Sequence, residues 1–141
     1  MKSISKNSKI TFVELNPTQF GILNGDTGYN IYAPFKFSPR SIPALHGVAL
    51  AGDYKDVQSI SPVYHGINEK LTESNFKRIF ESDILGITSI SRTSPQSITL
   101  AKMYKEKNPE GLVIAGWVDP TFRTYEWFKE GAADIIVRHE G

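Results

Sequence analysis

The sequence contains no cysteine, no long hydrophobic run and almost no excess of charge, and each absence excludes a class of protein. Without cysteine, the 141-residue chain can form no disulfide, no thiolate metal site, no iron–sulfur ligation and no cysteine nucleophile. No apolar stretch approaches the roughly 18 residues that a membrane-spanning helix needs. The net charge is +1, from 16 basic and 15 acidic residues, so the sequence lacks the basic character of a protein that binds nucleic acid or an anionic membrane.

What is present is the composition of an ordinary globular protein, with 40% hydrophobic and 22% charged residues. A chain of this length is most simply one domain with a substantial core. The polar start, MKSISKNSK, does not resemble a signal peptide, so we expect a cytoplasmic location. We expect residues 1–8 to form a flexible N-terminal arm and residues 9–141 to form the domain.

Five short apolar runs predict β-strands, and helical patterns separate most of them. The predicted strands cover residues 10–16, 57–64, 84–90, 112–116 and 134–138. Runs this apolar are typical of strands that are covered on both faces, as in a parallel sheet. Pro62 makes the second strand the least regular and favours a position near an edge.

Four segments predict helices. Pro43 begins one in which Leu45, Val48, Ala49 and Gly52 share a face. Thr72 is the expected N-cap of the second, with Leu71 and Phe76 as a hydrophobic staple and Phe76, Ile79 and Phe80 facing inward. Ser94 is the expected cap of the third, whose buried stripe is Ser97, Leu100, Ala101 and Tyr104. The fourth covers about residues 124–130 and ends at Gly131.

This alternation of strands and helices predicts an α/β protein, a three-layer α/β/α sandwich around a parallel sheet. Ligands bind such sheets at the carboxyl ends of the strands. The third predicted strand ends there in hydroxyls, at Ser89, Ser91, Thr93 and Ser94, and the fourth ends in Ala115-Gly116-Trp117. These residues are candidates for ligand contacts, although the hydroxyls could equally satisfy local backbone groups and the glycine could be a simple turn.

The segment from 17 to about 40 has no periodicity, yet it contains five aromatic residues. A loop of this length usually binds something or is disordered, and this one is too aromatic for a plain linker. Because it follows the first strand, we expect it to lie at the same edge of the sheet as the hydroxyls. It is a second indication of a ligand at that edge.

Other sites find little support in the sequence. The three histidines, His46, His65 and His139, have no metal-ligand spacing. A response regulator needs acidic residues where the first and third strands end, and this chain has Asn16-Pro17 and Ser89-Ile90-Ser91 there. NPTQFG, after the first strand, is neither a dinucleotide fingerprint nor a Walker loop.

The last 60 residues resemble the N-terminal cobalamin (vitamin B12)-binding domain of B12-dependent radical SAM proteins. That family has a "VGIS" strand, a helix, "NP", a "GG" strand end, "PTF", "EGAD" and "VVRGEG" in this order. The matching segments here are residues 85–88, 105–109, 113–116, 120–122, 130–132, 136–138 and 140–141. Before them the match is looser, at residues 42–47.

The resemblance implies a flavodoxin-like (Rossmann-like) fold with strand order 2-1-3-4-5, and a corrinoid across the carboxyl edge whose nucleotide tail reaches down between strands. It assigns Ser89, Ser91 and Thr93 to the tail or to the corrin side chains. It assigns Ala115, Gly116 and Trp117 to the family's Gly-Gly turn. Arg138, Glu140 and Gly141 would form the binding loop after the last strand. A neutral tail and corrin amides need hydrogen-bond partners rather than acids, which would explain the hydroxyls.

The motif D-x-H-x-x-G, whose histidine coordinates cobalt in the methionine-synthase type, is absent, because Val63 and Asn68 flank His65 at those positions. The resemblance therefore implies cobalamin bound without a protein histidine on cobalt. In this family an iron–sulfur cluster and S-adenosylmethionine belong to a radical SAM barrel that follows the domain, in enzymes of the methyltransferase or cyclase type. We expect this cysteine-free chain to be the N-terminal domain alone, with the barrel as its partner and no catalysis of its own.

Two alternative functions are a cofactor-free interaction or substrate-positioning domain and a binder of another flat or phosphorylated ligand.

Overall fold

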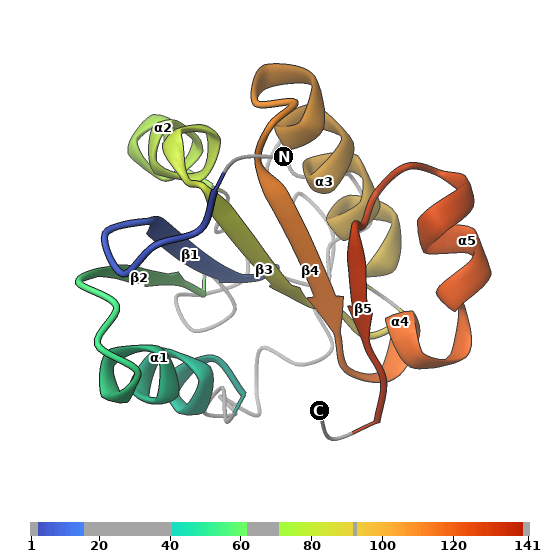
Figure 1. Ribbon diagram of the computed structural model, residues 1–141. Coiled ribbons are helices and arrows are strands. Elements are labelled where there is room, and N and C mark those ends of the chain that lie inside the picture. The colour runs from blue at the N-terminus through green and yellow to red at the C-terminus, as the bar shows by residue number, and fades with distance from the viewer. Residues whose placement is uncertain (1–2, 16–40, 62–70, 92, 140–141) are drawn as a thin grey trace.

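The computed structural model describes residues 3–15, 41–61, 71–91 and 93–139, which form a five-stranded parallel sheet with helices on both faces (Figure 1). The strand order is β2-β1-β3-β4-β5, so the predicted flavodoxin-like α/β fold is confirmed. The strands are β1 Lys9–Glu14, β2 Asp56–Ile60, β3 Ile84–Thr88, β4 Leu112–Gly116 and β5 Ile135–Val137. The helices are α1 Ser41–Ala51, α2 Glu73–Glu81, α3 Ser94–Lys107, α4 Val118–Phe122 and α5 Thr124–Lys129.

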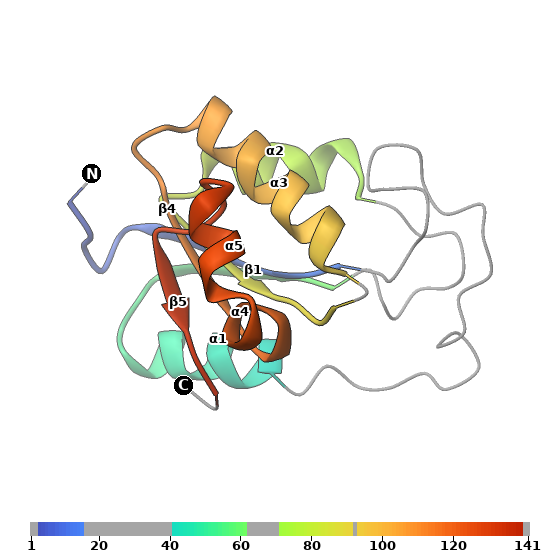
Figure 2. The same ribbon diagram turned by 90° about the vertical axis from the view of Figure 1, so that its right-hand side faces the viewer.

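The two faces of the sheet are covered unequally. Helices α2 and α3 lie on one face and α1 lies on the other (Figures 1 and 2). The main core belongs to the first face, where alternate strand residues such as Val13, Leu85 and Val113 pack with Leu100 of α3 and Trp127 of α5. On the face of α1, the described residues form only a small core of three buried side chains, Ile10, Ile84 and Leu112. This imbalance leaves room beside α1.

Helices α2 and α3 agree with the sequence in the faces they bury. Thr72 caps α2 in a capping box with Asn75, and Ile79 is fully buried with Phe76 and Phe80 beside it. Ser97, Leu100, Ala101 and Tyr104 are buried along α3, as predicted.

The predicted cap of α3 is wrong. The N-cap is Thr93, which makes no side-chain capping bond, and Ser94 is the first helical residue. The Ser94 hydroxyl instead accepts a hydrogen bond from Arg123 Nη1 at 3.2 Å. The tertiary contact with Arg123, which the local sequence does not reveal, gives this hydroxyl its partner.

The apolar face predicted for α1 is not the face that the helix buries. Ile42 is the buried residue of this helix, whereas Leu45 is 42% exposed and Val48 is 71% exposed. Apolar residues occur on all sides of α1, so its periodicity does not select one face. The tertiary structure decides which side contacts the sheet, and the sequence pattern does not.

Helix α4 and the turn before it were not anticipated. Trp117 has a φ of 81°, a backbone conformation that costs a bulky side chain energy, and it redirects the chain from β4 into α4. The fifth strand is three residues long, against the five predicted.

Some expectations fall outside the described residues. These are the aromatic segment to residue 40, the end of the second predicted strand, His65, Glu140 and Gly141. The flexible N-terminal arm stays a prediction; in its described part, Lys6 Nζ donates to Gly52 O at 2.5 Å and lies 4.4 Å from the centre of the Tyr54 ring. Among the described helices, none is long and apolar enough to cross a membrane.

Candidate functional site

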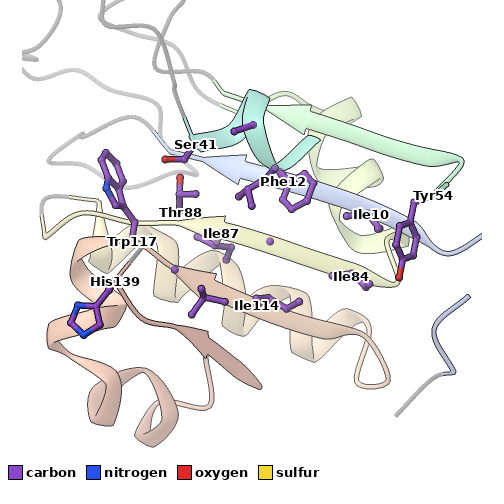
Figure 3. Close-up of a pocket in the computed structure, with 15 residues that line it drawn as sticks. Ile10, Phe12, Ser41, Tyr54, Ile84, Ile87, Thr88, Ile114, Trp117 and His139 are labelled. Atoms are coloured by element: carbon purple, nitrogen blue, oxygen red, sulfur yellow. The ribbon is translucent and has the colours of Figure 1, made fainter. Parts of the chain in front are cut away.

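A groove of about 580 Å³ lies on the face of the sheet that α1 covers only in part. Its floor is formed by strands β1, β3 and β4, and α1 lies along one side (Figure 3). Ala44 and Leu45 of α1 are among the lining residues. The groove runs along the strands from Thr88 to Ile84, five residues whose four steps span roughly 13 Å. A cavity of this size and shape is typical of a small-molecule site.

Strand alternation and register place the floor residues side by side. In a parallel sheet every second side chain points to the same face. Phe12 pairs with Gly86 and Gly86 pairs with Ile114, so these three residues form one row across β1, β3 and β4. The Phe12 ring lies over Gly86, where an added Cβ would be 2.5 Å from Phe12 Cδ1. Gly86 is therefore required for the ring to lie against the sheet.

The mouth of the groove is at the carboxyl edge and contains most of its polar groups. Ser41, Thr88, Trp117 and His139 lie at this end (Figure 3). Thr88 is 5% exposed, and its Oγ1 has no hydrogen-bond partner in the described part of the chain. A buried hydroxyl without a partner costs free energy, so Thr88 is ready to bind a polar atom of a ligand.

Thr88 was missed among the predicted site residues. The sequence places Ser89, Ser91 and Thr93 at the end of the predicted strand 84–90, and Thr88 in its interior. Three alternating positions, Ile84, Gly86 and Thr88, could have identified it, because the glycine between two larger residues marks a hollow on one face.

The hydroxyls that the sequence offers as ligand contacts after the third strand lie outside the lining of the groove. Ser89 is buried, and its Oγ lies 3.2 Å from Thr93 Oγ1 and donates to Ile90 O. Ile90 N donates to Thr93 Oγ1 at 3.1 Å, while Ser91 is exposed. Ser89 and Thr93 thus satisfy the local backbone, the alternative that the sequence had left open, and none of the three lines the groove described here.

The described residues predicted near the fourth and fifth strands lie in three different places. Gly116 and Trp117 line the groove. Ala115 is fully buried in the main core, because strand alternation turns its side chain to the opposite face. Arg138 is exposed and follows β5, outside the groove lining.

Hydrogen bonds to the turn after β4 hold the mouth in place. Ser89 N donates to Gly116 O, and Asp119 N donates to Ser89 O at 3.0 Å. The Asp119 side chain is buried and accepts from Trp127 Nε1 at 2.8 Å, while Arg123 Nη1 lies 3.5 Å from its other oxygen. Asp119 therefore has a structural role: it fixes α4 and the turn at Trp117 against the core.

The groove has the chemistry of a binding site. None of its described lining residues is Asp, Glu, Lys or Arg. Within the described ranges, no group of three or more His, Cys, Asp or Glu side chains could hold a metal ion. The apolar side chains and hydroxyls of this lining can hold and desolvate a ligand.

Glu14 is a partly buried acid at the end of β1, next to Thr88 in the strand register. Burial raises the pKa of its carboxyl above the usual 4.5, and its Oε2 contacts no donor among the residues described. The folded state therefore holds this proton more tightly than the unfolded state does. The resulting stabilisation is present below about pH 4.5 and is lost as the pH rises through the folded-state pKa.

We expect Glu14→Gln to raise the free energy of unfolding at pH 7 relative to the wild type, because the amide carries no charge to bury. The difference should shrink as the pH falls toward 4. Urea denaturation between pH 4 and 8 measures it, with Glu106→Gln at an exposed position as the control. Equal pH dependence in Glu14→Gln and wild type would contradict the prediction.

Comparison with known proteins adds one distant similarity. No protein-family model matches the chain. The chain is 28% identical over 104 residues to the anaerobic magnesium-protoporphyrin IX monomethyl ester cyclase of Rubrivivax gelatinosus. The match covers 73% of this chain and 19% of the cyclase, so the chain spans about a fifth of the length of this curated relative.

Proposed function

We propose that this chain is a corrinoid-binding module of a B12-dependent radical SAM enzyme and that the groove holds the nucleotide tail of the corrinoid. The observation that carries the proposal is a groove that descends from the carboxyl edge, with the unpartnered hydroxyl of Thr88 at its mouth. The carboxyl edge is where ligands bind sheets of this topology.

The residues of the groove fit such a tail. The volume of about 580 Å³ is within the range of pockets for molecules of nucleotide size. Phe12, Gly86 and Ile114 offer a flat apolar floor to a heteroaromatic base, and Thr88 Oγ1 can donate to a ring nitrogen or accept from an amide. When bound, the corrinoid would supply a cobalt centre; the residues of this chain would hold the tail and keep water from the base.

The similarity to the cyclase supports the proposed enzyme class. Its name is that of a ring-forming enzyme, which is one of the two reaction types that the sequence resemblance implies. The proposed partner is a radical SAM barrel, which would carry the iron–sulfur cluster and S-adenosylmethionine. The substrate would bind and react in that barrel. The cobalt is proposed to need no protein histidine.

The binding experiment uses hydroxocobalamin added to the purified protein, with the visible spectrum recorded after desalting. We expect about one corrinoid per chain at micromolar concentration, and weaker retention of cobinamide, which lacks the nucleotide tail. Loss of both corrinoids on desalting would overturn the proposal. Retention of a flavin in their place would favour another flat ligand.

Thr88→Val tests the polar contact at the mouth. Valine keeps the shape of threonine and removes the hydroxyl, so we expect cobalamin affinity to fall roughly 3- to 10-fold, the value of one hydrogen bond. Spectroscopic titration measures this dissociation constant. Thr99→Val, the same change on the exposed side of α3, is the control and should leave it unchanged. Equal affinities of Thr88→Val and wild type would exclude Thr88 as a contact.

A second candidate is a cofactor-free interaction domain, favoured by the apolar surface of α4 and α5. Phe122 is 82% exposed, Tyr125 is 73% exposed and Phe128 is 48% exposed. Exposed aromatic residues are enriched at protein interfaces. An empty protein in the cobalamin experiment would favour this function.

A further inference from the structure

The polar groups of the groove lie at its two ends. Ser41, Thr88, Trp117 and His139 are at the mouth, and Tyr54 is at the opposite end beside Ile84 (Figure 3). Between these ends, the described lining consists of carbon-rich side chains and glycine, mainly Phe12, Gly86 and Ile114 on the floor and Leu45 on the side of α1. A flat group lying between Thr88 and Tyr54 therefore meets an apolar surface.

We infer that the groove selects among corrinoids by the chemistry of the tail base, and that it prefers a benzimidazole or a phenol to a purine. This inference rests on the proposed function, because it concerns the same groove and the same tail. It concerns a different quantity, the ratio of affinities for corrinoids that differ only in the base.

The chemistry of the bases gives the direction of the preference. A benzimidazole has one ring nitrogen free for a hydrogen bond, and a phenol-type base has no ring nitrogen. Adenine carries further ring nitrogens and an amino group. Thr88 supplies one hydroxyl, which one ring nitrogen can use. The other polar atoms of adenine would lose their water and face Phe12, Ile114 and Leu45.

Gly86 and Phe12 determine the shape of the apolar section. Since the Phe12 ring lies against Gly86, the floor is flat where a side chain would otherwise rise from the middle strand. A flat base that packs on this floor gains contact over its whole face, whatever its substituents. The discrimination therefore comes from unsatisfied polar atoms on the edges of the base, and methyl groups there should be tolerated.

The experiment measures the dissociation constants of four corrinoids by spectroscopic titration of the purified protein. They are cobalamin, an adenine-bearing corrinoid, a phenol-type corrinoid and tailless cobinamide. We expect the phenol-type corrinoid to bind roughly 3- to 10-fold more weakly than cobalamin, because its base cannot accept from Thr88, and the adenine-bearing corrinoid to bind roughly 10- to 100-fold more weakly than cobalamin, as one or two buried unsatisfied polar groups require.

Two results overturn the inference, and they are distinguishable. If the adenine-bearing corrinoid binds as tightly as cobalamin, the selectivity is wrong and the proposed function stands. If none of the four binds, the proposed function fails and the inference fails with it.

Ile114→Thr should improve binding of the adenine-bearing corrinoid relative to cobalamin, a result that partial unfolding of the variant would not produce. Threonine keeps the branched shape suited to β4 and places a hydroxyl in the middle of the floor, so the affinity ratio of cobalamin to the adenine-bearing corrinoid should fall severalfold. Ile135→Thr is the matched control, because Ile135 pairs with Ile114 in the sheet and lies outside the groove lining. An unchanged ratio in Ile114→Thr would contradict the inference.

Discussion

Replacing Trp127 with alanine is expected to lower the free energy of unfolding by about 3–5 kcal/mol, the usual cost of deleting a large buried aromatic side chain. Trp127 is fully buried in the main core, and its indole Nε1 donates to Asp119 Oδ2 at 2.8 Å. The substitution leaves a cavity between α5 and the sheet. It also leaves a buried carboxylate oxygen without its donor, which adds to the cost.

Urea denaturation of the wild type and the variant measures this difference. Tyr125→Ala is the control, because Tyr125 lies on the same helix and is 73% exposed; its effect should stay within about 0.5 kcal/mol. Trp127→Phe separates the two causes, since it restores much of the packing and still removes the donor. A loss below 1 kcal/mol in Trp127→Ala would show that the core does not depend on this contact.

Gly86→Ala, which adds one methyl group, is expected to lower the proposed affinity for cobalamin at least about tenfold. The new Cβ would lie 2.5 Å from Phe12 Cδ1 and 2.9 Å from Phe12 Cε1, so the ring must move. The groove is the open space beside the ring, and the ring would turn into it. The site of the base would then be partly filled by Phe12.

Spectroscopic titration with cobalamin measures the loss, and urea denaturation of the same variant shows that it is folded. Gly47→Ala is the matched control, because a Cβ at Gly47 meets no atom within 4 Å. That control should keep wild-type affinity and gain up to about 1 kcal/mol in stability from the better helix propensity of alanine.

The double variant Gly86→Ala/Phe12→Leu tests the mechanism. Leucine is smaller than the ring, so the two substitutions should be strongly non-additive in the free energy of unfolding. Additive effects would mean that the added methyl group acts on something other than Phe12.

Much of the fold could be predicted from local pattern. The bounds of the third and fourth strands agree with the prediction to within two residues, because a short apolar run bounded by turn residues is typical of a buried strand. The stripe of α3 was identified because a single face of that helix is apolar or small. The same reasoning failed for α1, where Ile42 is buried and Val48 is 71% exposed. The apolar residues of that helix are distributed over all of its faces, so its sequence does not indicate which face is buried.

The groove opens at the edge of the sheet where the sequence predicts a ligand, and its lining includes only some of the predicted residues. Gly116 and Trp117 line the groove, whereas Ser89 and Thr93 bond to one another and to the backbone of Ile90. A hydroxyl in the sequence has no visible partner, so a ligand contact and a local hydrogen bond look alike. Thr88 differs from Ser89 because adjacent strand positions face opposite sides of the sheet.

The sequence by itself determined the class of the fold, because alternation of apolar strands with amphipathic helices is a local property that only a parallel sheet with covered faces satisfies. Only the tertiary structure decided where the described helices leave the sheet uncovered. The groove beside α1 depends on how one helix is placed across strands far apart in the chain, and on a Phe12 ring that rests on Gly86 of a neighbouring strand. Contacts between distant segments have no signature in local periodicity, so the position and lining of the site could be known only once the chain was folded.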